Sequence, residues 1–269
     1  MTTIFEDTAW CLSTPKRIRP RESEGSGLKS VGSALDVLEC FATDSELGVS
    51  DIARRLGCAK STAHRLLSTL VSRGFVEQDA GSGRYRLGIH IYELGQLALQ
   101  RNQLRFVALP TMHHVAQATG LTVNLGVPDG ADVVFVERME SADGVRFLGH
   151  SGRRMPAHVT SAGKAIAAFN EVAHQARLAA GFPPRARGTV RTPEDWVKAI
   201  EQVRKDRYAA SHSESFDGAS SVAVPIFQNR LAIAALSVFG ASELLTPRTD
   251  RLVPFLTAAA NRIAKAYAA

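Results

Sequence analysis

The side chains best suited to chemistry gather between residues 60 and 68, where cations alternate with short hydroxyl groups. Short hydroxyls let a helix approach a phosphate backbone closely, and Arg65 has the reach and the fork geometry to bond a guanine edge or a phosphate. Two further arginines follow nearby in the chain. The candidate DNA-binding residues are Lys60, Ser61, Thr62, His64, Arg65, Ser68, Arg84 and Arg86.

A helix-turn-helix followed by a two-stranded wing would position this cluster. Ser50 is the expected N-cap of a first helix that ends at Leu56. A second helix is expected from about Lys60 to Arg73, because apolar residues recur at helical spacing and leave the polar residues on the outer face. Glycines at 79–83 suit the tip of a hairpin, whose returning strand places its two arginines on one face. A small helical subdomain with a solvated polar face is the alternative.

A second candidate site lies in the C-terminal half of the chain. Thr160 to Gly163 should open a helix, whose free N–H groups suit a carboxylate and whose small side chains leave room for one. Serines on two adjacent expected strands offer hydroxyls, and apolar side chains could form a wall, a mixture that fits a small organic acid. Ordinary tight packing at Ala162 and Gly163 is the plain alternative. The candidate effector-binding residues are Phe147, Leu148, Met155, Ser161, Ala162, Ser221, Ser237 and Phe239.

Enzyme and metal motifs do not fit. The dipeptide at 163–164 is similar to the end of a P-loop, but alanine follows the lysine, and His158 stands where the first glycine belongs. His113 and His114 are adjacent, so they point to different faces of a helix and cannot chelate one metal. Three other histidines could converge only through the fold, and we expect them to be hydrogen-bonded or exposed: His150, His158 and His212. We expect no catalytic residue, no metal and no cofactor.

The charge balance permits a polyanionic partner without locating it. The chain has 269 residues, a net charge of +6 and a pI of about 9.5, and its length allows two domains with separate cores. Residues 1–100 hold 12 cations and 12 anions, so the case for DNA depends on local clustering. From Asp51 to Gly74 there are five cations and one anion.

The cysteines and the N-terminus favour a cytoplasmic protein. Cys11, Cys40 and Cys58 form no CxxC pair, which suits a reducing compartment. The first residues are polar and include two acids, so neither a signal peptide nor a membrane anchor is expected. Residues 1–27 are rich in charge, proline and glycine, and we expect a disordered arm.

Helices should dominate up to Gly120. A helix is expected from Ser30 to Ala42, with an apolar stripe that includes Val31 and Leu35 and covers the back of the helix-turn-helix. Another is expected from 87 to about 105, with a stripe formed by Leu87, Ile91, Leu94 and Ala98. A third should run from 103 to Gly120, interrupted or kinked at Pro110.

The apolar period then changes to that of strands. Strands are expected at 121–127, 132–138 and 145–149, and again at 208–215, 220–227 and 231–239. A helix is expected within 157–170, beginning near Thr160 or Ser161, and further helices are expected at 171–180, 192–207 and 247–268. This order predicts an α+β fold in which an antiparallel sheet carries flanking helices.

One stretch resembles a known family. SDIARRLGCAKSTAHRLLSTLVSRGFVEQD, followed by a glycine tip and RYRLG, resembles the winged helix-turn-helix of IclR-type bacterial transcriptional regulators. VGSALDVLECFA is similar to that family's first helix, and PAHVTSAGKAIAAF and VAVPIFQNRLAIAALSVFG are similar to its C-terminal effector-binding domain. The resemblance covers roughly residue 29 to the C-terminus.

Four segments are expected. The arm at 1–27 lies outside the resemblance, and a winged helix-turn-helix follows at 28–86. The resemblance implies a linker and dimerisation helix at 87–105 and a GAF-like effector-binding domain at 106–269. Where relatives often carry an acidic residue this chain has Ser211 and His212, and where they often carry cysteine it has Ser221. Ser211 therefore joins the effector-binding candidates, and the identity of the effector stays open.

We accordingly expect a sequence-specific DNA-binding transcriptional regulator whose operator binding is modulated by a small metabolite, an organic acid. A homodimer, or a dimer of dimers, should bind double-stranded DNA at a near-palindromic operator, with no role for a membrane. Two alternatives stay open. One is a small-molecule enzyme with an accessory DNA-binding domain, and the other is a constitutive DNA-binding protein whose second domain only oligomerises.

Overall fold

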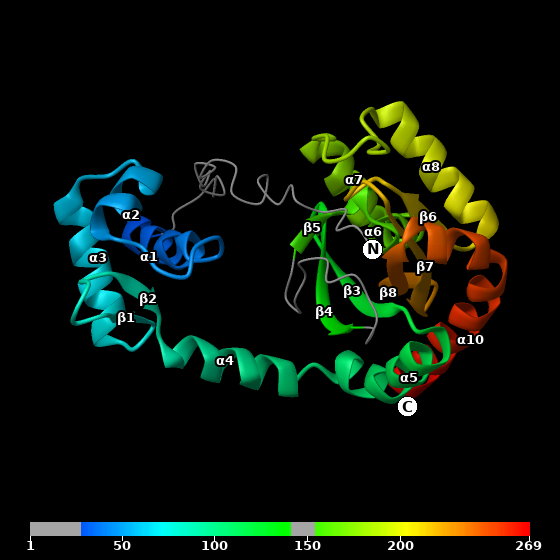
Figure 1. Cartoon of the computed structure of the whole chain (residues 1–269), viewed down its shortest axis with the longest axis horizontal. Coiled ribbons are helices and arrows are strands. Elements are labelled where there is room, and N and C mark those ends of the chain that lie inside the picture. Colours follow the sequence, from blue (N-terminus) through cyan, green and yellow to red (C-terminus); the bar gives the residue numbers. More distant parts are fainter. Residues whose placement is uncertain (1–27, 141–153) are drawn as a thin grey trace, which may run out of the picture. The chain divides into compact units, whose positions relative to one another are not determined.

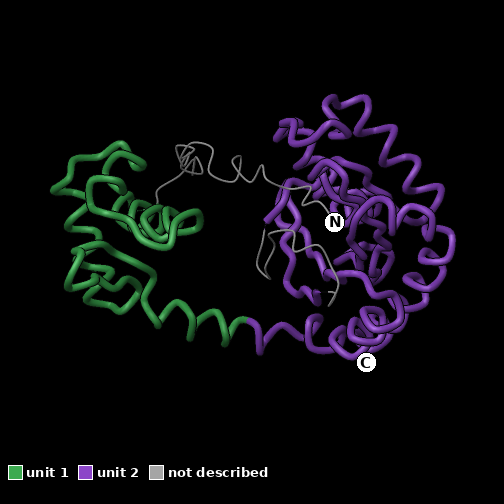
Figure 2. The backbone as a smooth tube through the Cα atoms, in the orientation of Figure 1, with its two compact units in different colours: residues 1–98 green, residues 99–269 purple. Residues whose placement is uncertain are grey.

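The chain forms two compact units, residues 1–98 and residues 99–269 (Figure 2). The computed structural model describes residues 28–140 and 154–269. The expected arm at 1–27 and the expected strand at 145–149 lie outside the described residues, as do the candidates Phe147 and Leu148. Among the described residues, every helix is either too short or too polar to cross a bilayer.

The first unit is a three-helix bundle with a wing (Figure 1). Its core includes Val37 of the first helix, Ile52 of the second, Leu67 of the third and Tyr85 of the wing. The wing is an antiparallel hairpin, and Leu47 adds an isolated bridge to Tyr85. The elements are α1 (Lys29–Cys40), α2 (Val49–Leu56), α3 (Lys60–Ser72), β1 (Val76–Gln78), β2 (Tyr85–Leu87) and α4 (Ile89–Gln100).

The start of α2 corrects a prediction. Ser50 lies inside the helix, and the N-cap is Gly48. The Asp51 carboxylate accepts the Gly48 N–H at 3.2 Å, so a side chain of the first turn reaches back to the backbone of the cap residue. At the other end, Gly57 adopts φ 66°, as expected for a left-handed residue that ends a helix.

The expected apolar stripe of α1 is wrong in its first half. Val31 and Leu35 are 53% and 57% exposed, whereas Val37, Cys40 and the following Phe41 are buried. The helix packs on α2 and α3 with the face that carries Val37 and Cys40. Its N-terminal apolar residues are therefore on the surface of the first unit.

The expected continuous helix from 87 to 105 is also wrong at both ends. Leu87 belongs to β2, and α4 begins at Ile89. Gly88 lies between the strand and the helix. Only glycine fits at this position, because a Cβ would lie 2.2 Å from the Gly74 carbonyl oxygen. After α4 ends, Asn102 caps a new helix by accepting the Arg105 N–H at 3.0 Å. That helix, α5 (Gln103–Thr119), continues through Pro110 without the interruption that was expected there, and is capped by Gly120, with φ 67°.

The described residues of the second unit form a six-stranded antiparallel sheet in the order β5-β4-β3-β8-β7-β6. This confirms the predicted α+β class. Strand β5 was not predicted, and β6 is shorter than expected. The strands are β3 (Thr122–Asp129), β4 (Asp132–Met139), β5 (Arg154–Pro156), β6 (Ala209–His212), β7 (Ala219–Gln228) and β8 (Leu231–Ala241).

Helices cover both sides of this sheet (Figure 1). On one side α5 and α10 pack on an apolar surface that includes Val123, Val222 and Leu236. On the other side α6 packs on β7 and β8, with α7 and α8 beside it. The helix expected to begin near Thr160 or Ser161 is α6, which begins at Ser161, and a 3-10 turn, η2 (Ala157–Val159), precedes it. The remaining bounds are α6 (Ser161–Ala167), α7 (Glu171–Ala180), α8 (Pro193–Asp206), α9 (Ser242–Leu245), η3 (Thr246–Arg248) and α10 (Thr249–Ala268).

Candidate functional site

The outer face of α3 carries the predicted DNA-binding cluster. Ala63, Leu67 and Leu70 are buried and anchor the helix in the core. The six candidates on α3 are all exposed: Lys60, Ser61, Thr62, His64, Arg65 and Ser68. Ala59, the N-cap, offers no side-chain hydrogen bond, so the first N–H groups of the helix add positive potential beside the cluster. This surface suits a polyanion.

The two wing arginines lie in different surroundings. Arg84 donates to the Glu46 carbonyl at 2.9 Å and lies 4.0 Å from the Asp51 carboxylate. Arg86 lies 3.3 Å from the Glu77 carboxylate. Both side chains are about half exposed, at 46% and 52%, so each could exchange its protein partner for a phosphate.

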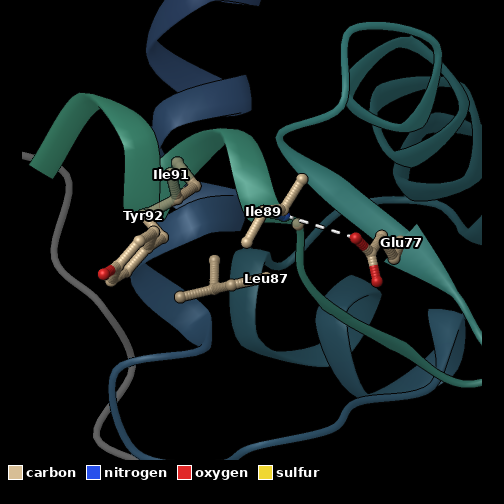
Figure 3. A pocket seen from close by; sticks show the side chains of 6 residues that line it. Glu77, Leu87, Ile89, Ile91 and Tyr92 are labelled. Atoms are coloured by element: carbon tan, nitrogen blue, oxygen red, sulfur yellow. Dashed lines mark hydrogen bonds between the residues drawn. The ribbon is translucent and has the colours of Figure 1, made fainter. Parts of the chain in front are cut away.

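Glu77 also joins the wing to α4 (Figure 3). Its carboxylate accepts the Ile89 N–H at 3.3 Å, which satisfies a free donor at the start of the helix. Beside it lies an apolar pocket of about 400 Å³ lined by Glu77, Leu87, Gly88, Ile89, Ile91 and Tyr92. Further along α4, Leu94 and Leu97 are exposed as well. A helix with this much apolar surface is typical of an interface.

In the second unit the predicted effector site lies where α6 meets the sheet. Ser161, at the start of α6, donates to Ser221 of β7 through an Oγ–Oγ contact of 2.7 Å. Register places Ser221 between Ser211 of β6 and Phe239 of β8, so the three share one side of the sheet. Ser237 lies on the same side, two residues from Phe239. The fold therefore brings together five of the nine predicted residues.

Two other predicted residues belong to the core. Ala162 and Met155 are 1% and 3% exposed and pack in the apolar cluster between the sheet and α6 to α8. Gly163 has a packing reason, because a Cβ there would lie 2.4 Å from backbone atoms of Ala157. At this position the plain alternative, tight packing, accounts for the small residue.

Lys164 is held inside the protein. Its Nζ donates to the Ala210 carbonyl at 2.6 Å and to the Glu214 carboxylate at 2.6 Å. The lysine side chain is 5% exposed and that of Glu214 is 12% exposed. The pair ties α6 to β6 and the loop after it, and so fixes the helix that carries Ser161.

His158, in η2, is an uncharged buried histidine. Burial lowers the pKa of His158 to about 4. Its Nε2 lies 3.1 Å from the Pro183 carbonyl oxygen, so Nε2 carries the proton in the neutral ring. His212 contacts the Ser220 hydroxyl at 3.0 Å, and His113 and His114 are exposed on α5.

Sequence reasoning missed two polar residues of this sheet face. Asn124 is buried on β3, opposite Ser237 in register, and Arg138 of β4 pairs with it from the other side. The Arg138 Nη1 donates to the Asn124 Oδ1 at 3.2 Å. The alternation in the sequence TVNLG could have indicated Asn124. The side of the sheet on which Arg138 lies depends on a register shift between β3 and β4, and the sequence pattern does not reveal that shift.

Comparison with known proteins supplies the family context. A family model described as the bacterial transcriptional regulator IclR C-terminal domain matches residues 96–265, and one described as the IclR helix-turn-helix domain matches residues 30–80. The glycerol operon regulatory protein of Streptomyces coelicolor is 38% identical over 224 residues, which cover 83% of this chain and 88% of that protein. The transcriptional regulator XynR of Escherichia coli is 33% identical, covering 83% and 88%.

Solved structures of IclR proteins are similar to this chain. An IclR transcriptional regulator from Alicyclobacillus acidocaldarius has a TM-score of 0.79 at 29% identity, covering 90% of this chain and 100% of that chain. An IclR homologue from Microbacterium hydrocarbonoxydans, complexed with 4-hydroxybenzoate, has a TM-score of 0.76 at 32% identity, covering 88% and 98%.

Proposed function

Because the chain belongs to the IclR family and is a DNA-binding transcriptional regulator, we propose that α3 reads its operator and that an organic acid bound on the serine-bearing sheet face alters that reading. The exposed polar face of α3 supports the first part. The Ser161–Ser221 hydrogen bond supports the second, because two hydroxyls in contact at a helix–sheet junction can reorient toward a ligand. A relative complexed with an aromatic hydroxy acid supports an acid as the ligand class.

Three observations favour this proposal over the two alternatives named above. An enzyme would need an acid, a base or a nucleophile poised at the serine face, and the buried ionic pair nearest to it, Lys164 and Glu214, is used to hold α6 in place. A purely oligomerising second domain would not need a polar sheet side beneath α6. The relatives reported above are named as regulators, which agrees with this choice.

We propose that two copies associate and bind a near-palindromic operator. The exposed apolar residues of α4 and of the pocket at its start, Leu87, Ile89, Tyr92, Leu94 and Leu97, provide the contact surface. Such an interface is self-complementary in a two-fold dimer, which places two α3 helices on two half-sites. The protein would act in the cytoplasm, with its operator.

The DNA part predicts two different mutant behaviours. Arg65→Ala should weaken specific binding by about 1–3 kcal/mol if the side chain reads a base. Arg84→Ala should weaken binding evenly across sequences and flatten its salt dependence, because its loss removes a phosphate contact. Gel shifts at fixed salt on specific and scrambled duplexes would measure both effects. Arg73→Ala, also exposed but at the C-terminal end of α3, is the control. Unchanged affinity in both variants would contradict the assignment.

The metabolite part of the proposal predicts a variant that loses the response to acids but keeps its affinity for the operator. Ser221→Leu should place a bulky apolar side chain against Ser161 and abolish stabilisation by acids in thermal shift, while operator affinity without ligand is unchanged. Ser221→Ala should weaken the ligand by about 1 kcal/mol, the value of one neutral hydrogen bond. Thr257→Leu, exposed on α10 across the sheet, is the matched control. Full acid binding by Ser221→Leu would place the site elsewhere.

A further inference from the structure

One carboxylate in the first turn of α2 is shared by two arginines from different elements. Asp51 lies 2.7 Å from the guanidinium of Arg54, in the last turn of α2, and 4.0 Å from that of Arg84, in the wing. The exposed fraction of the side chain is 72% for Arg54 and 46% for Arg84. Two cations therefore lie beside one anion on the surface of the first unit, and the group carries a net positive charge.

Backbone pairing holds this group together. Leu47, directly before the N-cap of α2, pairs with Tyr85 of β2 through two backbone hydrogen bonds of 2.9 Å. This pairing places the start of α2 against the returning strand of the wing, which brings Arg84 close to Asp51. Arg54 is therefore on the same surface as Arg84, which is one of the proposed DNA-binding residues.

The two arginines of α2 differ in what they bind. Arg55 points inward, because its side chain is 11% exposed and donates to the Cys40 carbonyl at 2.8 Å and to the Asp44 carboxylate at 2.6 Å. Arg54 donates to Asp51 through one Nη atom, and its other N–H groups have no acceptor in the parts of the chain that the structure describes. A guanidinium has five N–H donors, so Arg54 can keep this contact and bind a phosphate as well.

Stability alone does not account for the pair of Asp51 and Arg54. Exposed ion pairs three residues apart on a helix contribute little, because water solvates both charges. Holding an arginine in place does favour binding, since side-chain freedom that is already lost is not lost again when a phosphate binds. The carboxylate is itself held, because it accepts the Gly48 N–H.

We propose that Arg54 is a further phosphate-binding residue and that Asp51 positions Arg54 and Arg84, so that α2 and the wing bind the DNA backbone beside α3. This inference depends on the DNA face proposed above and adds a contact from α2. Loss of Arg54 should remove one phosphate contact. Loss of the Asp51 charge should weaken binding only through the two arginines that it holds.

The salt dependence of binding to random-sequence DNA tests the Arg54 contact, because phosphate contacts do not depend on sequence. The probe is a random-sequence duplex of about 30 base pairs, titrated with the full chain by fluorescence anisotropy at several salt concentrations. Arg54→Gln should weaken binding about fivefold or more and flatten the slope of log K against log salt by about 0.9 for each bound copy. Arg54→Lys keeps the charge and should retain the wild-type slope. Arg73→Gln, exposed at the C-terminal end of α3, is the matched control and should retain it too.

A double-mutant cycle tests the positioning role of Asp51. Asp51→Asn keeps an oxygen for the Gly48 N–H but removes the charge that holds the arginines. In the wild-type background it should weaken DNA binding about twofold or more. In a background that carries both Arg54→Gln and Arg84→Gln it should instead strengthen binding, because only repulsion between carboxylate and phosphate remains. Equal strengthening in both backgrounds, in proteins with unchanged thermal unfolding, would show that Asp51 only repels DNA and would overturn its positioning role.

The outcomes separate this inference from the proposed DNA face. If Arg84→Ala flattens the salt dependence but Arg54→Gln does not, the role of Arg54 is refuted and the DNA face is upheld. If Arg54→Gln, Arg84→Ala and Arg65→Ala all bind DNA as the wild type does, both proposals fail.

Discussion

Glu214→Ala should destabilise the second unit by about 3–5 kcal/mol, because it leaves the Lys164 ammonium buried without its counter-charge. Urea unfolding of the full chain, followed by tryptophan fluorescence to which the buried Trp196 contributes, would measure the loss. Metabolite binding should weaken as well, since α6 carries Ser161. The pair thus links stability to the proposed site.

Two variants make this expectation specific. Glu201→Ala removes an exposed carboxylate from α8 and should change stability by less than about 0.5 kcal/mol. The double replacement Lys164→Met with Glu214→Leu should recover most of the loss, because apolar residues of similar volume can substitute for a buried pair. A Glu214→Ala protein within about 1 kcal/mol of the wild type would show that the pair does not hold α6.

Acid should destabilise the protein through His158. Its folded pKa of about 4 lies below the ordinary value of 6.5, so between these values the unfolded chain binds a proton that the folded chain does not. The contribution of the neutral His158 to the free energy of unfolding is complete above pH 6.5 and is lost as the pH falls toward 4. At about 1.4 kcal/mol for each unit of pKa, the loss is roughly 2 kcal/mol by pH 5 and roughly 3 kcal/mol by pH 4.

The comparison with His158→Gln isolates this effect. Burial also lowers the pKa of His174, which adds a change of the same sign in both proteins. Glutamine can still donate to the Pro183 carbonyl but does not titrate. The difference in unfolding free energy between the two proteins should therefore shrink as the pH falls from 7 to 5. A constant difference over that range would contradict the buried neutral histidine.

Local sequence signals were sufficient for the DNA-binding unit. The apolar residues of α3 recur at helical spacing and are buried, and Gly57 adopts the left-handed conformation that its position predicted. Where the prediction failed, a competing interaction decided the outcome. The helix α2 begins at Val49, one residue before Ser50, and the Asp51 carboxylate accepts the backbone N–H of its N-cap, Gly48. The stripe on α1 was periodic, yet the periodicity could not reveal that Val31 and Leu35 would find no partner within the described first unit.

The second site was less accessible to sequence reasoning because it depends on pairing between distant strands. The contact between Ser161 and Ser221 joins residues 60 positions apart. Both were expected near the ligand, Ser161 at a helix start and Ser221 on a strand, but their mutual hydrogen bond was not predicted. Arg138 was missed because the bulge at Val136 changes the side to which every later residue of β4 points. Gly163 was noticed for the room that it leaves, whereas the structure assigns it to close packing against Ala157.

Selection of duplex DNA from a random pool by the full chain, at about 150 mM salt, tests the central claim most directly. The account predicts enrichment of one near-palindromic motif, with half-sites about one helical turn, or 10–10.5 base pairs, apart or a multiple of it. The Arg65→Ala protein should lose preference within the half-sites, and an organic acid that binds the second unit should change the affinity of the wild type for the selected duplex. Recovery of no motif, or of a single half-site that Arg65→Ala binds equally well, would contradict it.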